Sequence, residues 1–221
     1  MTRGSTKTTS SRTHRRRNLV AAAGFVLAVA AVSPAADPSP TQVVDGLANQ
    51  VLPILRDESL TAAQKRDRIE QIAYQAMDFG TLSRLVLARN WSKFSPAQQS
   101  AFEAEFKRHL SVTYGRNVEN YNNETVQMLG ERPESHGDVT VLTKILRGGA
   151  SADVLVDYRL RQRDGQWKII DVIVERVSLV SNFRSQFQDI VSNGGPDRLI
   201  TLLKEKNSKG EALQKPTPAG S

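Results

Sequence analysis

The segment from Gln166 to Ile190 reads QWKIIDVIVERVSLVSNFRSQFQDI. Its first half is rich in β-branched residues and predicts a strand that turns at residues 176–178. Its second half carries Phe183, Phe187 and Ile190 at steps of four and three, which is the spacing of one face of a helix. A strand that runs directly into a helix indicates an α+β fold. No residue pattern in this segment is typical of a catalytic centre.

Three further strands are predicted before this segment. Residues 125–129 and 137–146 form the first two, and residues 152–162 alternate apolar with charged side chains along the third. Asp164-Gly165 is a hairpin signal, and the fourth strand spans residues 167–177. Four consecutive strands joined by short turns predict an antiparallel curved sheet with one solvated face.

Helices are predicted on both sides of these strands in the sequence. Residues 41–56, 61–77 and 79–87 place apolar side chains at helical spacing. After the strands, residues 179–191 and 196–206 do the same, and the intervening Asn193-Gly194-Gly195 separates them into two helices.

The longest predicted helix runs from residue 96 to residue 121. Ser95 is a natural N-cap, Pro96 suits the first turn, and Gln98 completes a capping box. The helix carries an apolar stripe that is mostly aromatic and that must lie against another apolar surface. The stripe consists of Phe102, Phe106, Leu110, Tyr114, Val118 and Tyr121.

Residues 1–36 have the layout of a secretory signal peptide. A basic stretch precedes an apolar run from Leu19 to Val32, and Ser33-Pro34-Ala35-Ala36 follows as a cleavage site. The run has 14 residues, short of the roughly 20 that span a bilayer as a helix. The pattern predicts export to the periplasm, either by the Sec route or by the twin-arginine route. The second is an alternative because residues 16–20 resemble a twin-arginine signal. Residues 37–206 are then the folded domain, and residues 207–221 a disordered tail.

The charge of the chain is concentrated in this export segment. The whole sequence has 30 Lys and Arg against 23 Asp and Glu, and residues 1–36 contain six basic and no acidic side chains. The remainder has 24 basic and 23 acidic groups, a net charge of +1. Attraction to nucleic acid or to anionic lipid scales with net charge and its clustering, so neither is indicated. The chain has no cysteine, so the domain relies on its core rather than on disulfides.

Few residues could carry chemistry. Of three histidines, His14 belongs to the signal peptide, while His109 and His136 have no partner at metal-ligand spacing and are predicted to lie at the surface. Ser178 is predicted to cap the following helix, because no G-x-S-x-G motif surrounds it. The sequence therefore predicts no catalytic residue, no metal and no cofactor.

Several short motifs follow one another along the chain. They are Asp78-Phe79, Ala88-Arg89-Asn90-Trp91, Phe94-Ser95-Pro96-Ala97-Gln98-Gln99, Phe106-Lys107-Arg108-His109-Leu110, Thr113-Tyr114-Gly115, Trp167-Lys168-Ile169, Val177-Ser178-Leu179-Val180 and Leu199-Ile200. Together, over roughly residues 40–206, they resemble the MlaC / toluene-tolerance family of periplasmic phospholipid-binding proteins. Related hopanoid-associated carriers share much of the pattern. The chain departs from it at Ala88, Arg176 and Arg198, where the family pattern has glycine.

The resemblance implies a hydrophobic pocket between the curved sheet and several helices. Acyl chains would lie inside the pocket and the polar head near its mouth. Strand alternation and helical spacing select ten candidate lipid-binding residues. These are Phe106, Tyr114, Val141, Ile145, Val154, Val156, Tyr158, Val172, Val174 and Leu179.

The resemblance also implies a place in lipid transport. The chain would be a monomeric periplasmic carrier, the substrate-binding component of an ABC transporter system that maintains outer-membrane lipid asymmetry. It would shuttle phospholipid between an inner-membrane ABC transporter complex and an outer-membrane lipoprotein complex, or carry a hopanoid or other lipid in the same fold.

Two alternatives stay open. The first alternative is an isomerase-type enzyme that uses Asp157 or Asp171, because a curved sheet can hold a buried carboxylate as a general base. Asp157 lies on the charged face of its strand, however, and solvation explains it more simply. The other alternative is a packed interaction module without a ligand.

Overall fold

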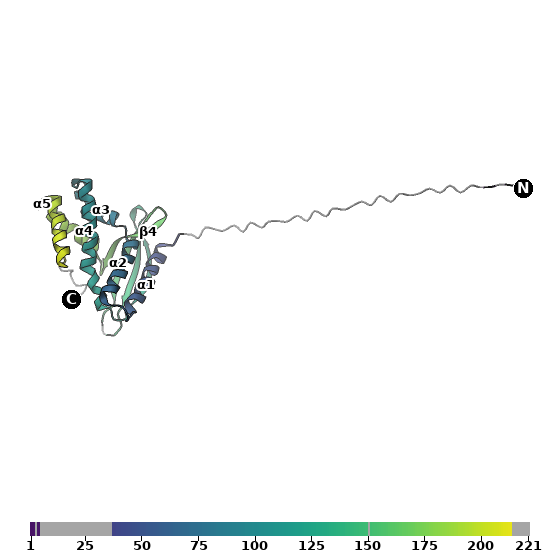
Figure 1. Cartoon of the computed structure of the whole chain (residues 1–221), viewed down its shortest axis with the longest axis horizontal. Helices are drawn as coiled ribbons and strands as arrows, with labels where there is room; N and C mark the ends of the chain where they lie inside the picture. The colour runs from purple at the N-terminus through teal and green to yellow at the C-terminus, as the bar shows by residue number, and fades with distance from the viewer. Residues whose placement is uncertain (3, 5–36, 150, 214–221) are drawn as a thin grey trace. The chain divides into compact units, whose positions relative to one another are not determined.

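The computed structural model describes residues 1–2, 4, 37–149 and 151–213 (Figure 1). Nearly all of the predicted signal peptide, and residues 214–221 of the predicted tail, lie outside this range. No helix in the described part of the chain is long and apolar enough to cross a membrane. All elements below belong to the compact unit Ala36–Ser221.

The centre of the domain is an antiparallel sheet of five strands in sequence order. The strands are β1 (Thr125–Pro133), β2 (Val139–Leu146), β3 (Val154–Arg163), β4 (Gln166–Val174) and β5 (Val177–Ser178). The predicted α+β fold with an antiparallel meander is confirmed, but the fourth predicted strand is divided. Glu175 and Arg176 both adopt positive φ, at 47° and 67°, so the chain folds back after Val174 and pairs for two residues.

The helices follow the sequence closely, because their caps are local. They are α1 (Pro40–Arg56), α2 (Ala62–Ala76), α3 (Phe79–Leu87), α4 (Pro96–Tyr114) and α5 (Leu179–Lys209), with 3-10 turns η1 (Ala88–Lys93), η2 (Gly115–Asn120) and η3 (Ser135–Gly137). Capping boxes at Ser39, Thr61 and Ser95 begin α1, α2 and α4.

Two helix boundaries differ from the prediction. The helix predicted over residues 96–121 ends at Tyr114 and tightens into η2, which contains the poor helix formers Gly115, Asn117 and Asn120. At the other end of the chain, α5 continues to Lys209, three residues beyond the expected limit of the domain. Within α5, Gly195 at φ 71° interrupts the helix where two helices were expected.

Two of the three expected glycine positions carry strained backbone. Ala88 has φ 47° and ψ −124°, and Arg176 has φ 67°, both in regions that disfavour side chains. The third, Arg198, is an ordinary helical residue that packs over Gly194. A Cβ on Gly194 would lie 2.7 Å from Arg198 Cγ. At Ala88 and Arg176 the backbone therefore adopts a conformation that glycine favours, although neither residue is glycine.

We therefore expect Ala88→Gly to raise the free energy of unfolding by about 1 kcal/mol, because glycine adopts this backbone conformation without a Cβ clash. Urea unfolding measures the change. Ala48→Gly, in regular helix within α1, is the matched control and should cost about 0.5–1 kcal/mol. A loss of stability in both variants would contradict strain at residue 88.

Each face of the sheet packs against different helices (Figure 1). Cross-strand pairing places Val141, Tyr158 and Val172 on one face, where Val141 and its neighbours meet α1. We call this the α1 face. Arg159 and Asp171 point to the opposite face, where Asp171 accepts a hydrogen bond from the first turn of α5. The α1 face and the α5 side of the sheet are therefore separate environments.

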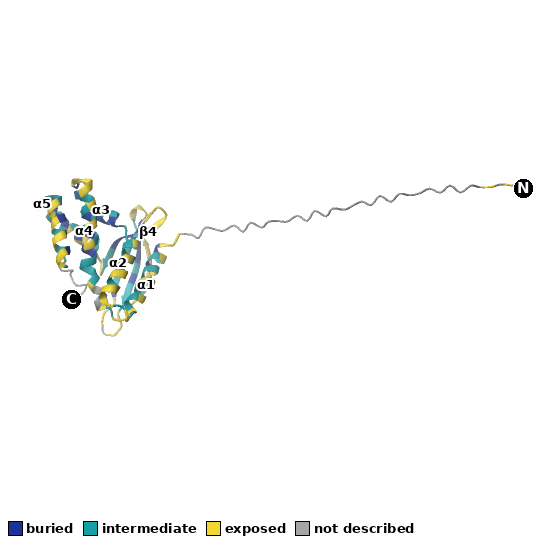
Figure 2. Cartoon of the chain, viewed as in Figure 1, coloured by how far each residue is buried: buried dark blue, intermediate teal, exposed yellow. Residues whose placement is uncertain are grey.

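An aromatic core joins α3, α4 and α5, and α4 packs along α5 rather than along the sheet. Phe102, Phe106 and Phe187 are 0% exposed, and Phe183 completes the group. Phe106 lies 5.1 Å from Phe183 and 5.3 Å from Phe187 between ring centroids, both edge to face. The stripe predicted on α4 therefore meets the helix of the segment 166–190. Figure 2 shows this concentration of buried residues around α3, α4 and α5.

Candidate functional site

The packing between α1, α2 and the α1 face differs from that of the aromatic core. Only Pro40 and Val44 are buried among the residues of α1, and no residue of α2 is buried. The apolar side chains of both helices are instead half-buried, although their spacing points them toward the domain. They include Val43, Leu47, Val51, Ile54, Leu55, Ile69, Ile72, Ala73 and Ala76. We call these residues and the α1 face together the α1–sheet layer.

Tyr158 shows the character of this layer. The Tyr158 side chain is half-buried on the α1 face, and this burial raises the pKa of its phenol. Its hydroxyl has no hydrogen-bond partner in the part of the chain that the structure describes. A half-buried ring on this apolar face is accessible to an apolar ligand.

Seven of the ten predicted lipid-binding residues lie on the α1 face. Val141, Tyr158 and Val172 belong to the cluster that contacts α1, and Val154 and Val156 are buried beside them. The other two, Ile145 and Val174, are half-buried at the ends of their strands.

The three predicted residues from helices lie elsewhere. Phe106 is fully buried inside the aromatic core, and Tyr114 and Leu179 are half-buried against the same core. Burial raises the pKa of the Tyr114 phenol. The structure therefore brings the strand residues together and separates them from the helix residues.

Several members of the layer are absent from the predicted set. Val43, Leu47 and Ala76 contact the sheet cluster from α1 and α2, and Met128 and Trp167 from β1 and β4. The helical stripe of residues 41–56 includes Val43 and Leu47, so the sequence predicts that both face the domain. The sequence does not predict which helix covers the sheet, because periodicity identifies an apolar face but not its partner.

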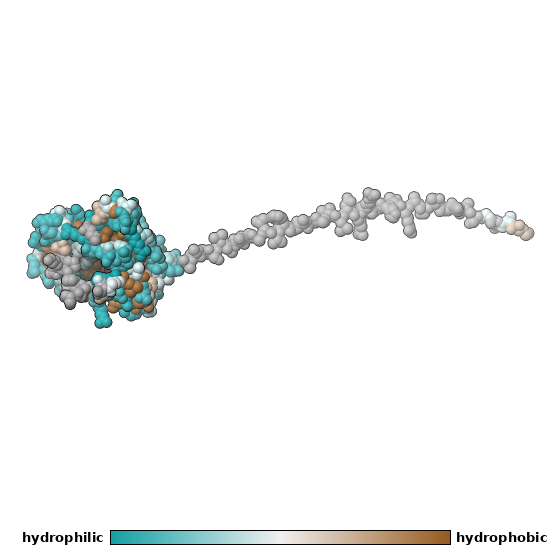
Figure 3. Space-filling model, turned by 90° about the horizontal axis from the view of Figure 1, so that it is seen from below, coloured by the Kyte–Doolittle hydropathy of each residue, from teal (hydrophilic) through white to brown (hydrophobic). Residues whose placement is uncertain are grey.

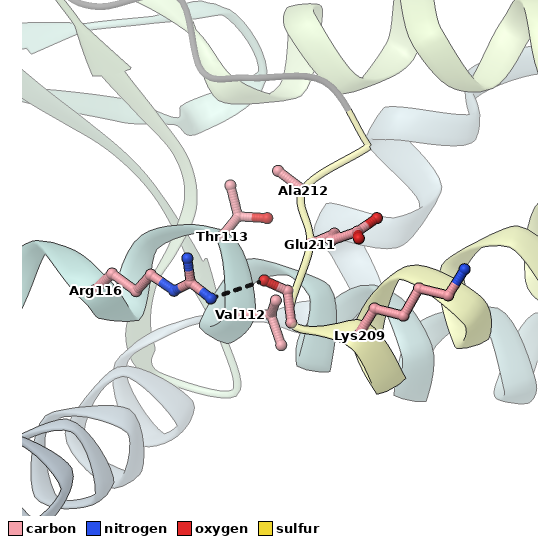
Figure 4. Close-up of a pocket in the computed structure, with 7 residues that line it drawn as sticks. Val112, Thr113, Arg116, Lys209, Glu211 and Ala212 are labelled. Atoms are coloured by element: carbon pink, nitrogen blue, oxygen red, sulfur yellow. Dashed lines mark hydrogen bonds between the residues drawn. The ribbon is translucent and has the colours of Figure 1, made fainter.

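Neither of two clefts in the described part of the chain is lined by any of the ten predicted residues. One, of about 400 Å³, lies where the C-terminal segment crosses the end of α4 (Figure 4), and Arg116 Nη2 donates to the Gly210 carbonyl there at 3.2 Å. The other, of about 240 Å³, lies between α3 and β3. On the face seen in Figure 3, hydrophobic residues gather in patches, and contiguous apolar surface is typical of interaction sites.

His109 is buried, which corrects the prediction of a surface histidine. It is 1% exposed, and its Nδ1 lies 2.9 Å from Asn207 Oδ1. Its Nε2 accepts from the Leu213 N–H at 3.3 Å, which places the ring proton on Nδ1 as donor to Asn207. Burial lowers the pKa of His109, while the Asn207 hydrogen bond opposes the shift. The neutral ring therefore ties the end of α5 and Leu213 to α4.

This arrangement predicts that stability falls in acid. The unfolded chain takes up a proton at His109 near the ordinary value of 6.5, whereas the folded chain resists it, so stability is lost as pH falls below that value. Urea unfolding at pH 7.5 and 5.5 measures this loss of stability. The loss should be smaller in His109→Gln. It should be unchanged in the control His136→Gln, because His136 lies at the surface. An equal pH dependence in both variants would rule out His109 as the source.

The candidate carboxylate Asp171 and the nearby Arg184 both have structural partners. Asp171 is 2% exposed, and its two oxygens accept from Ser178 Oγ at 2.5 Å and from the Val180 N–H at 3.0 Å. Ser178 in turn accepts from the Ser181 N–H, so the predicted helix cap is confirmed. Arg184 donates from Nε and Nη2 to the Leu85 carbonyl at 3.0 and 2.8 Å. These groups fasten the start of α5 to β4 and to α3.

Asp157 lies on the face opposite to the α1 face and is half-buried. Neither candidate carboxylate therefore points into the α1–sheet layer. Within the described residues, no group of three or more histidine or acidic side chains is arranged to hold a metal ion.

Comparison with known proteins identifies relatives along most of the chain. A family model described as "MlaC protein" matches residues 45–205. The toluene tolerance protein ttg2D of Pseudomonas putida is 28% identical over 188 residues, 83% of this chain and 85% of that protein. The intermembrane phospholipid transport system binding protein MlaC of Haemophilus influenzae is 23% identical over 127 residues, 56% of this chain and 59% of that protein.

A solved structure has the same fold. It is the phospholipid-binding protein of Ralstonia solanacearum in complex with a phospholipid, with a TM-score of 0.68 and 25% identity. The match covers 79% of this chain and 99% of that one.

Proposed function

We propose that this chain, which belongs to the MlaC family, is a lipid carrier that encloses acyl chains in the α1–sheet layer. The observation that carries the proposal is the contrast between the two apolar regions of one domain. The aromatic core is built of buried side chains, whereas in the α1–sheet layer the apolar side chains that face the sheet from α1 and α2, and Ile145, Tyr158, Val172 and Val174 of the sheet, are mostly half-buried. A related fold that holds a phospholipid supports this assignment.

The energetics of acyl chains explain why such a layer is useful. Burial of one CH₂ group is worth about 0.8 kcal/mol, so a chain of roughly 16 carbons represents on the order of 12 kcal/mol of transfer free energy. A lipid therefore leaves a membrane for water very slowly. A protein that encloses the chains lowers this barrier by contact alone, and the proposal involves no catalytic residue or cofactor.

The layer suggests how a lipid would be oriented. Acyl chains would lie along Tyr158 and Val172, between the sheet and α1, because these side chains are only half-buried, and Val141 is buried beside them. The headgroup would stay at the margin of the layer, since it keeps its hydration there. Ile145, Val154, Val156 and Val174 extend the same apolar face along β2, β3 and β4.

The cellular role proposed here is transport through the periplasm. The name of the Haemophilus influenzae relative describes intermembrane phospholipid transport. By analogy this chain would receive lipid from one membrane complex and deliver it to another, an inner-membrane ABC transporter and an outer-membrane lipoprotein complex. A phospholipid is the proposed ligand, and a hopanoid in the same layer is the alternative.

Uptake of lipid by delipidated protein tests the proposal. The protein is incubated with phospholipid vesicles, separated by gel filtration, and assayed for phosphorus and protein. We expect close to stoichiometric phospholipid, with hopanoid-containing vesicles as the competing source. Preferential uptake of the hopanoid would replace the phospholipid assignment, and uptake of neither lipid would refute the carrier.

A further inference from the structure

The second cleft lies on the opposite side of the sheet from the α1–sheet layer. It has a volume of about 240 Å³ and is lined by Thr81, Arg84 and Leu85 of α3 and by Arg161 and Arg163 of β3. Alternation along β3 directs these two arginines away from the α1 face, to which Leu160 belongs. The proposed lipid layer and the cleft are therefore separated by the sheet.

Hydrogen bonds hold two of the three guanidinium groups of the cleft. Arg161 donates from Nε and Nη2 to the two carboxylate oxygens of Asp138, at 2.7 and 2.8 Å. Arg163 Nη1 donates to Asp78 Oδ2 at 3.2 Å and to the Thr81 hydroxyl at 3.3 Å. Such bidentate and shared bonds restrict the side chains before a ligand arrives, which lowers the entropy lost on binding.

Arg84 completes the cleft in a different way. Its guanidinium carbon lies 5.5 Å from the centre of the Trp91 ring, a cation–π contact that uses the face of the group rather than its N–H donors. No hydrogen bond from Arg84 to another described residue is found. Arg84 is thus positioned by its contact with Trp91, and its N–H donors make no hydrogen bond to the described residues.

The cleft has a surplus of donors and of positive charge. Each guanidinium has five N–H donors, and Arg161 and Arg163 each use only part of theirs on Asp138, Asp78 and Thr81. Among the residues that line the cleft and the carboxylates bonded to them, three guanidinium groups and the carboxylates of Asp78 and Asp138 leave one net positive charge. An added carboxylate would neutralise this charge and satisfy several of these donors at once.

We propose that this cleft is a docking site for an acidic segment of a protein partner. One carboxylate of the partner would sit among Arg84, Arg161 and Arg163, and an apolar neighbour would contact Leu85. A fixed arrangement of charges of this kind gives specificity and faster association. For a carrier that must hand over its cargo, the cleft would hold the partner without obstructing the α1–sheet layer.

The charges around the cleft favour a protein over an anionic membrane. Membrane attraction depends on clustered net charge, whereas Asp78 and Asp138 lie within the site and residues 37–221 have a net charge of only +1. The cleft is also recessed between a helix and a strand, which suits a protruding side chain better than a flat surface. A lipid bound in the α1–sheet layer is on the wrong side of the sheet to place its headgroup here.

Titration of the full folded domain with an acidic peptide, acetyl-Glu-Asp-Leu-Glu-Asp-amide, tests the proposal by NMR. We expect the peptide to shift the amide signals of Thr81 and Leu85 and the side-chain Nε–H signals of Arg84, Arg161 and Arg163. Arg84→Gln should weaken binding about tenfold, the loss typical of one charge-assisted hydrogen bond. Raising salt from about 20 to 200 mM should weaken it further.

Arg176→Gln is the matched control, because Arg176 is an exposed arginine at the far end of β4. It should bind the peptide like the unchanged protein. Equal weakening by both substitutions would overturn the site, as would equal saturation by inorganic phosphate at the same concentration. Binding to phosphatidylglycerol vesicles that depends on Arg84 would assign the cleft to a membrane instead. Lipid content, assayed on the same samples, reports on the carrier function separately and should be unchanged in Arg84→Gln.

Discussion

Replacement of Phe187 by alanine is expected to lower the free energy of unfolding by about 3–5 kcal/mol, the usual loss for a large aromatic side chain removed from a packed core. Phe187 is 0% exposed and lies 5.5, 5.3 and 5.4 Å from the ring centroids of Phe102, Phe106 and Phe183. The surrounding rings belong to α4 and α5 and cannot all move inward to fill the space. Urea unfolding measures the change.

Val177→Ala is the control, because Val177 is 60% exposed and its truncation should change stability by less than about 0.5 kcal/mol. If Phe187→Ala fails to fold, Phe187→Leu gives a smaller loss that can still be measured. A loss below about 1 kcal/mol in Phe187→Ala would show that the aromatic core is not the packed half of the domain.

Replacement of Val172 by tryptophan is expected to reduce phospholipid uptake at least tenfold while changing stability by less than about 1 kcal/mol. Val172 is half-buried on the α1 face, beside Tyr158. If space for acyl chains exists there, the indole ring occupies it and competes with the lipid. In a fully packed layer the same substitution would instead cost about 1–3 kcal/mol through overpacking.

Ile173→Trp is the matched control for this substitution. Ile173 is the next residue of β4, is also half-buried, and points to the opposite face of the sheet. It should leave lipid uptake unchanged. If Val172→Trp and Ile173→Trp lower uptake equally, the ligand does not lie in the α1–sheet layer.

Local sequence signals were sufficient for most of the fold. Asp78 caps α3 through the Thr81 N–H, so the start of α3 was predictable from a neighbouring residue. The same holds for the capping box at Ser95. The division of the last strand into β4 and β5 was not predictable from the sequence, because Glu175 and Arg176 are unusual residues for a tight hairpin turn.

The candidate site was predictable in part. Alternation along β2, β3 and β4 placed seven residues on one face correctly relative to one another, because a strand has a period of two. Phe106 was grouped with them only because it lies on an apolar stripe. Its partners are Phe183 and Phe187, more than 70 residues away in the sequence, and periodicity does not identify such partners.

The burial of His109 has a similar origin. The residue lies on the flank of the α4 stripe, where local spacing predicts partial exposure. Asn207 and Leu213 cover it from the C-terminal end of the chain. Long-range packing of this kind decides the environment of a flanking residue.

Native mass spectrometry of the protein purified from a periplasmic extract tests the central claim most directly. The account predicts a folded chain whose mass exceeds that of the processed polypeptide by one phospholipid, and loss of this added mass in Val172→Trp. A protein that is folded, fully stable and free of lipid when isolated, and that stays so after incubation with phospholipid vesicles, would contradict it.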